Sequence, residues 1–297
     1  MTKAADRPGD ANAITRNYFD RILLELRHIG AVQPDTSLEL YGQKFSTPIM
    51  MAALSHLNSC HPDGLVEMAR GAKLAGAVNW AGMGDLDELR RILDVGVPTI
   101  RIIKPYAERR LIEERIRVAE EGGALAVGMD VDHQFTGRGT PDVIHDLVMA
   151  PQSLEDLAYW CRFTELPFVV KGVLSVRDAV LALEAGARGI VVSHHHGIVD
   201  YALPPLMILP DIAAAIGGRI PIFVDCGINS GMDAFKALAL GATAVSAGRI
   251  VMGPLAAKGA EGVRELVEKM TAELAGVMAR TAAGSLAEID PTVLHVQ

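Results

Sequence analysis

The chain has 297 residues, of which 50% are hydrophobic and 22% charged, enough for one large hydrophobic core. Its formal net charge of -8 argues against a nucleic-acid or anionic-membrane partner, because either would repel it and no long basic run offsets the charge. The three cysteines, Cys60, Cys161 and Cys226, are too scattered for a disulfide framework or a zinc site, so we expect a cytoplasmic location. Segment 1–13 lacks the apolar stretch of a secretory signal, and no run approaches the ~20 apolar residues of a membrane span.

In chain order, a segment at 13–35 reads as an arm with a helix, and a repeating pattern of short apolar runs and amphipathic segments follows. The β-branched runs predict strands at 47–52, 77–79, 99–103, 125–130, 168–171, 189–193, 220–225 and 242–246. Helices are expected at 63–75, 84–93, 108–121, 153–164, 175–185, 205–216, 231–239 and 261–279. Alternating strands and helices pair in parallel, and eight such units fit a closed barrel better than an open sheet. The expected fold is α/β: a single-domain (β/α)8 TIM barrel over 1–297, with the barrel at about 46–285 and a short N-terminal helical arm.

The predicted strands end in polar side chains. Active-site groups of such a barrel project from the C-terminal ends of its strands. Reading those ends in order gives Asn79, Lys104, Tyr106, Asp130, Asp132, Lys171, Ser193, His194, His195, His196, Asp225 and Arg249. Ionisable groups there are costly unless they are paired or functional, so their clustering predicts an enzyme site.

The last two strands end in turns suited to a phosphate. Asp225 and Gly227 follow the seventh strand, with Ser230 nearby, and Gly248 and Arg249 follow the eighth. Glycines let backbone amides approach a phosphate closely, and an arginine can bind it with two hydrogen bonds. We expect a phosphate site here, against the alternative that these are ordinary turns with Arg249 in a surface ion pair.

Two further strand ends suggest chemistry. Lys171 ends an apolar run, where it could stabilise an anionic cofactor ring, form a Schiff base or pair with a buried acid. The run His194-His195-His196 cannot direct all three rings at one point, because adjacent strand residues face opposite sides. We therefore expect no metal site but one catalytic histidine, oriented by Asp130 or Asp132.

Longer motifs now carry a resemblance. Segments 16–22 (RNYFDRI), 166–173 (LPFVVKGV), 190–193 (IVVS) and 235–242 (FKALALGA), followed by Gly248-Arg249, resemble the FMN-dependent α-hydroxy-acid oxidase and dehydrogenase family of the glycolate oxidase and lactate oxidase type. The resemblance runs from about Asn17 to about Ile289. It implies FMN as cofactor, a small-molecule substrate and a homo-oligomer, as tetramer or octamer.

The resemblance also implies roles for individual residues. His195 would be the catalytic base, Asp132 would orient it, Lys171 would lie beside the N1/O2 edge of the flavin, and Tyr106 would contact the substrate. The other positions implied to contact FMN are Ala52, Ala53, Asn79, Lys104, Asp130, Ser193, Asp225, Gly227, Ser230, Gly248 and Arg249.

The chain departs from the family on the substrate side. Ile198 stands where the family has an arginine that binds the substrate carboxylate, and the loop is one residue shorter, so His196 rivals His195 for the base. Lys104 and Arg138 are the cations expected to hold an acid instead, and His196 is counted with the substrate contacts. The expected function is oxidation of a small 2-hydroxy acid or related alcohol to the 2-oxo product. The alternatives are an FMN-dependent lyase or isomerase without net redox, and a flavin-free barrel that binds a sugar phosphate.

Overall fold

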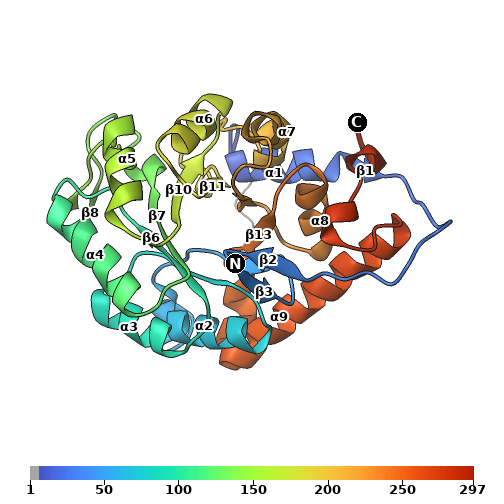
Figure 1. Cartoon of the computed structure of the whole chain (residues 1–297), viewed down its shortest axis with the longest axis horizontal. Helices are drawn as coiled ribbons and strands as arrows, with labels where there is room; N and C mark the ends of the chain where they lie inside the picture. Colours follow the sequence, from blue (N-terminus) through green and yellow to red (C-terminus); the bar gives the residue numbers. More distant parts are fainter. Residues whose placement is uncertain (1–6) are drawn as a thin grey trace.

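A computed structural model describes residues 7–297 and has a barrel of parallel strands at its centre (Figure 1). The eight strands lie in the order β4-β13-β12-β11-β10-β7-β6-β5. Their bounds are β4 (Ile49–Met51), β5 (Asn79–Ala81), β6 (Thr99–Ile103), β7 (Ala126–Asp130), β10 (Phe168–Val173), β11 (Gly189–Val192), β12 (Ile222–Val224) and β13 (Ala244–Ala247). Backbone contacts close the ring between its first and last strands: Met51 N–H donates to Val78 O at 3.1 Å, and a parallel bridge joins Leu54 and Ala81. The predicted (β/α)8 barrel is confirmed.

Helices surround the strands. They are α2 (Gly64–Leu74), α3 (Leu86–Asp94), α4 (Arg109–Glu121), α5 (Leu154–Phe163), α6 (Val176–Glu184), α7 (Pro205–Ile216), α8 (Gly231–Ala239) and α9 (Met252–Arg280). Short 3-10 helices lie at Leu57–Ser59, Val131–His133, Arg249–Val251, Leu286–Glu288 and Pro291–Val293. The last helix begins nine residues before the predicted 261 and contains a break at Gly259, whose φ of 56° is not helical. No helix of the described residues is both long and apolar enough to cross a bilayer.

Alternate strand residues fill the barrel. Met50, Trp80, Ile100, Val169 and Phe223 belong to one buried cluster, in which the Trp80 and Phe223 rings meet edge to face at 5.2 Å. Because side chains alternate along a strand, the residues next to these in sequence face the helices instead. This alternation decides which residues of each strand end can reach the barrel mouth.

The chain before the barrel covers both of its ends. The hairpin of β2 (Leu38–Leu40) and β3 (Gln43–Phe45), which was not among the predicted elements, packs into the inner cluster, and the Tyr41 hydroxyl at its turn donates to Arg188 O at 2.7 Å. Helix α1 (Ala11–Asp20), the helix of the predicted arm, lies beside α7 and α8 in Figure 1.

Two small sheets complete the structure. Strand β1 (Ile22–Leu24) pairs with β14 (Leu294–Val296), and β8 (Val143–Ile144) pairs with β9 (Leu147–Val148) between β7 and α5. The expectations for segment 1–13 and for one domain over 1–297 include residues 1–6, which lie outside the described part, and both stay predictions.

Candidate active site

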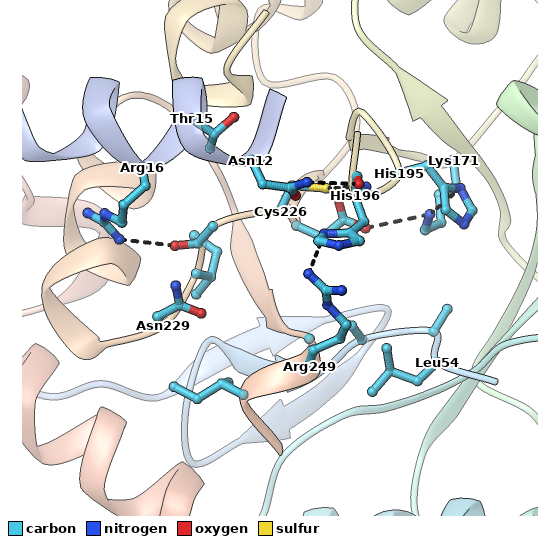
Figure 2. A pocket seen from close by; sticks show the side chains of 17 residues that line it. Asn12, Thr15, Arg16, Leu54, Lys171, His195, His196, Cys226, Asn229 and Arg249 are labelled. Carbon is cyan, nitrogen blue, oxygen red and sulfur yellow. Dashed lines mark hydrogen bonds and ion pairs between the residues drawn. The ribbon is translucent and has the colours of Figure 1, made fainter. Parts of the chain in front are cut away.

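The C-terminal ends of the strands open on a cavity of about 230 Å³ (Figure 2). Predicted site residues that line it are Ala52, Ala53, Lys171, His195, His196, Asp225, Gly227, Gly248 and Arg249. In Figure 2, Lys171 and His195 lie together at one end of the pocket, Arg16 and Asn229 lie at the other, and Arg249 extends to the His196 ring between them. Residues from five predicted strand ends thus meet at one mouth.

A chain of buried charges supports Lys171. Lys104 Nζ donates to Asp130 Oδ2 at 2.8 Å, Lys171 Nζ lies 3.0 Å from Asp130 Oδ1, and Lys171 Nζ lies 3.5 Å from Asp225 Oδ2. All four side chains are buried. Each follows an inward-facing apolar residue of its strand by an even number of positions, so the alternation sends it into the barrel. Buried charges of this kind are tolerated because they are paired.

The pKa values of this chain keep its charges in place. Burial alone would raise the pKa of the Asp130 carboxyl, but Lys171 and Lys104 outweigh that effect and hold it well below its usual range. Burial would likewise lower the pKa of Lys171, but Asp130 and Asp225 raise it above its usual value. Lys171 is therefore a fixed cation at the cavity wall, and not the neutral amine that a Schiff base requires.

His195 is held by the acid that the resemblance implies. Its Nδ1 lies 3.0 and 3.1 Å from the two carboxylate oxygens of Asp132, and Asp130 Oδ1 is farther away at 3.7 Å. Gly172 makes room for this contact: it has φ of 95°, it sits at an irregularity in the β10–β11 pairing, and a Cβ there would lie 2.4 Å from Asp132 Cγ. Of the two candidate acids, Asp132 is the one within hydrogen-bond distance of His195.

The other two histidines of the run make separate contacts. His194 lies 2.9 Å from the Thr15 hydroxyl of α1, and its Nδ1 accepts the Gly197 N–H at 2.8 Å. His196 Nδ1 lies 2.7 Å from Arg249, and burial, followed by the charge of Arg249, lowers the pKa of His196 to about 4. His196 is thus neutral near pH 7 and accepts from Arg249. His194 and His196 thus contact α1, their own loop and Arg249, and of the three histidines His195 alone has an acidic partner at its ring.

Eight predicted site residues do not line the cavity: Asn79, Lys104, Tyr106, Asp130, Asp132, Arg138, Ser193 and Ser230. Asn79 is fully buried on the outward face of β5, where its Nδ2 donates to the Thr99 hydroxyl at 3.4 Å, so a flavin contact is not supported. Ser230 is the N-cap of α8, and its hydroxyl donates to Asp233 at 3.0 Å instead of facing the pocket. Arg138 is exposed in the loop after β7.

Tyr106 does not line the cavity either. It is buried, and the Arg115 guanidinium lies 4.7 Å from its ring centroid, so its substrate role stays a prediction. Ser193 lies behind the cavity, where its hydroxyl accepts the His195 N–H at 3.0 Å and fixes the loop that carries His195.

Several site residues that were not predicted come from distant segments. Asn12 and Arg16 of α1 line the cavity, and Arg16 binds Asp233 through two nitrogens at 2.9 and 3.1 Å. His133, in the segment after β7, contacts His195 at 3.2 Å between Nε2 atoms, and Asp142 lies 3.0 Å from Nδ1 of His133. The motif at 16–22 signalled that the α1 segment matters, but no pattern in the sequence placed it over the mouth.

Asp132, His133 and His195 lie close enough together to be considered as a metal site. However, the Asp132 oxygens face Nδ1 of His195, whereas His133 faces its Nε2. His195 thus turns different nitrogens toward the two groups in this structure, and the expectation of no metal stays a prediction.

The donor groups of the cavity fit FMN. Arg249 forms no ion pair with a carboxylate of residues 7–297, so its charge is available for a phosphate. A Cβ at Gly248 would have Ala52 Cβ as its nearest neighbour, at 4.0 Å, so the backbone is open to a close ligand. Lys171 supplies a second cation at the far end, where a flavin ring gains negative charge on reduction.

The sequence matches the family described as FMN-dependent dehydrogenase over residues 5–154 and 142–296. It is 33% identical to glycolate oxidase from Spinacia oleracea over 93% of this chain and 85% of that protein, and 33% identical to glycolate oxidase 1 from Oryza sativa subsp. indica over 92% and 84%.

Solved structures agree. A mandelate oxidase mutant with the monooxide FMN adduct superposes with a TM-score of 0.88 at 31% identity, covering 99% of this chain and 93% of that one. Mandelate oxidase with (S)-2-phenylpropionate superposes with a TM-score of 0.86 at 30% identity, covering 97% of this chain and 90% of that one. These matches confirm the resemblance, and with it FMN as the cofactor. The chain belongs to the FMN-dependent dehydrogenase family and is an FMN-dependent oxidoreductase.

Proposed function

We propose that this protein oxidises a small 2-hydroxy acid, or a related alcohol, to the 2-oxo product, with His195 as the base. The observation that carries the proposal is the His195–Asp132 contact of 3.0 Å beside the Lys171 cation, at the end of a cavity suited to FMN. An imidazole oriented by a carboxylate takes a hydroxyl proton efficiently. FMN, when bound, accepts the carbon-bound hydrogen together with its electron pair. Relatives that are named glycolate oxidase and mandelate oxidase support this reaction class.

The remaining site residues have supporting roles in this proposal. Arg249 and Gly248, with Gly227, hold the FMN phosphate, and Ala52 and Ala53 line the ring. Asp225, which also lines the cavity, and the buried Asp130 and Lys104 behind it fix the position and charge of Lys171.

The protein lacks the arginine with which the family binds the substrate carboxylate. Ile198 is 37% exposed at that position, and Lys104 is already paired with Asp130 inside the barrel. A fixed carboxylate clamp is therefore not part of our proposal, and neutral 2-hydroxy amides belong in the substrate test beside the acids.

The test is anaerobic addition of short and aromatic 2-hydroxy acids, and of their amides, to the FMN-loaded protein. We expect bleaching of the flavin absorbance and one 2-oxo product per flavin. Product formation without bleaching and without an electron acceptor would contradict oxidation and favour a lyase or isomerase. Protein that binds no FMN would contradict the proposal and favour a sugar-phosphate ligand.

We also propose a cytoplasmic homo-oligomer, as tetramer or octamer. The arm after β1 exposes apolar side chains, with Leu26 at 56%, Val32 at 58% and Ile29 at 100%, which supports burial against another copy. All three cysteines are free thiols, which supports a reducing compartment. Light scattering tests the assembly, and a monomer at micromolar concentration would contradict it.

A further inference from the structure

Arg249 is the cation expected at the FMN phosphate, and a single contact fixes its side chain. The guanidinium is exposed at the mouth of the cavity and forms no ion pair with a carboxylate of residues 7–297. Its one side-chain hydrogen bond within that part of the chain runs to His196 Nδ1, at 2.7 Å (Figure 2). The position of the Arg249 guanidinium therefore depends on the His196 ring.

The His196 ring can only accept in this contact. A guanidinium has donors and no acceptor, so Nδ1 of His196 must be without a hydrogen. Burial, and then the charge of Arg249, lower the pKa of His196 to about 4, so the ring is neutral near pH 7 and carries its single hydrogen on Nε2. Neither ring nitrogen is then free to take a proton from a substrate. The contact thus removes His196 from the role of base and ties it to Arg249.

The backbone of His196 is held from two sides. Its N–H donates to Cys226 Sγ at 3.3 Å, and its carbonyl accepts a side-chain N–H of Asn12 at 3.1 Å. Its φ of 59° lies in the left-handed region, which glycine enters at no steric cost and other residues do not. A side chain held in such a conformation by contacts from two other segments points to a function of that side chain.

We propose that His196 is a positioning residue that holds the Arg249 guanidinium ready for the FMN phosphate. The inference rests on the phosphate assignment of Arg249 in the proposed function. A guanidinium that gives one N–H to His196 keeps its other N–H groups for phosphate oxygens. Arg16, the other arginine of the cavity, is bound to Asp233 through two nitrogens, so phosphate binding at this end depends on Arg249.

The contact changes how much order Arg249 must gain when FMN binds. Immobilising a flexible side chain on binding weakens the affinity by about 2- to 12-fold. Loss of the His196 contact should therefore weaken FMN binding by about fivefold, well short of the loss of about 100-fold expected when Arg249 itself is removed. Riboflavin, which has no phosphate, should bind as before.

The test compares FMN with riboflavin. Full-length protein loaded with either flavin is diluted, and the dissociation constant is taken from the fluorescence of the released flavin. H196G removes the ring and places glycine at a φ that suits it, and H196Q keeps an acceptor oxygen. H145G is the matched control, because His145 is an exposed histidine with φ of 50° in the turn between β8 and β9. We expect a loss of FMN affinity of about fivefold in H196G, unchanged riboflavin affinity, and wild-type values in H196Q and H145G.

A double variant shows whether His196 acts through Arg249. If it does, H196G adds no loss of FMN affinity in an R249M background. A loss of less than about twofold in H196G alone, or an additive loss of about fivefold in the double variant, would overturn the proposal. So would an equal loss of riboflavin affinity in H196G, or an equal loss of FMN affinity in H196Q or H145G.

R249M separates this inference from the assignment on which it rests. If R249M weakens FMN binding and H196G does not, Arg249 binds the phosphate without His196, and the inference alone fails. If R249M leaves the FMN affinity unchanged, the phosphate assignment of the proposed function fails, and this inference with it. No substrate enters the experiment, so neither result bears on the oxidation of a 2-hydroxy acid.

Discussion

Replacing Asp132 by Asn removes the charge that orients His195 and leaves the side chain nearly the same size. Both carboxylate oxygens lie within 3.1 Å of His195 Nδ1, and the Asp132 side chain is only 11% exposed, so water screens the contact little. A hydrogen bond to a charged group contributes about 1.5–3 kcal/mol. If the imidazolium forms in the transition state, the D132N substitution lowers kcat/KM by about 10- to 150-fold.

Stopped-flow measurement of flavin reduction tests this value, because it isolates the step in which the hydroxyl proton leaves. D146N is the matched control, since Asp146 lies in the same segment after β7 and is exposed. We expect D132N to slow reduction without weakening FMN binding, and D146N to behave as wild type. A loss of less than about threefold in D132N would refute the role of Asp132 in orienting the base.

Three further predictions follow from the same geometry. R249M should weaken FMN binding by about 100-fold in a fluorescence titration, because a charge-assisted phosphate contact is lost; unchanged affinity would contradict the phosphate assignment. D130N should lower the free energy of unfolding by about 3–5 kcal/mol in denaturant melts, because Lys104 and Lys171 keep buried charges without their counterion; a loss below about 1 kcal/mol would contradict that pairing. The depressed pKa of His196, about 4 against 6.5 for an ordinary histidine, means that its stabilising effect is full above pH 6.5 and is lost as the pH falls toward 4. H196Q should therefore reduce the decline in melting temperature over that range, and an identical decline would contradict the shift.

The barrel and most of its mouth were predictable because strand alternation is a local rule. Once the ends of the strands were found, the rule sent Lys171 and Asp225 inward, and the expected phosphate-binding pair, Gly248 and Arg249, does line the cavity. The same rule made the prediction for Asn79 wrong, because the position of this strand along the sequence was misjudged. The strand was predicted to end there, but β5 begins at Asn79 and runs to Ala81, and Asn79 has the opposite orientation to the inward-facing Trp80.

Other features depend on contacts that no local pattern shows. Ser230 could bind a phosphate or cap a helix, and in the structure its hydroxyl caps α8 by accepting the Asp233 backbone N–H. His133 contacts His195, and Asp142 contacts His133, only because of the path of the irregular loop after β7. The β2–β3 hairpin did have a signal, the alternation of Leu38, Leu40 and Phe45 around a turn that Gly42 favours.

The proposed chemistry requires one cavity in which Arg249 and Lys171 bind opposite ends of the same FMN. The most direct measurement is a crystal structure of the FMN-loaded protein. We predict the phosphate within hydrogen-bond distance of Arg249 and the Gly248 backbone, and the ring edge against Lys171 with His195 over its face. Density for FMN elsewhere, or with the phosphate directed away from Arg249, would contradict this arrangement.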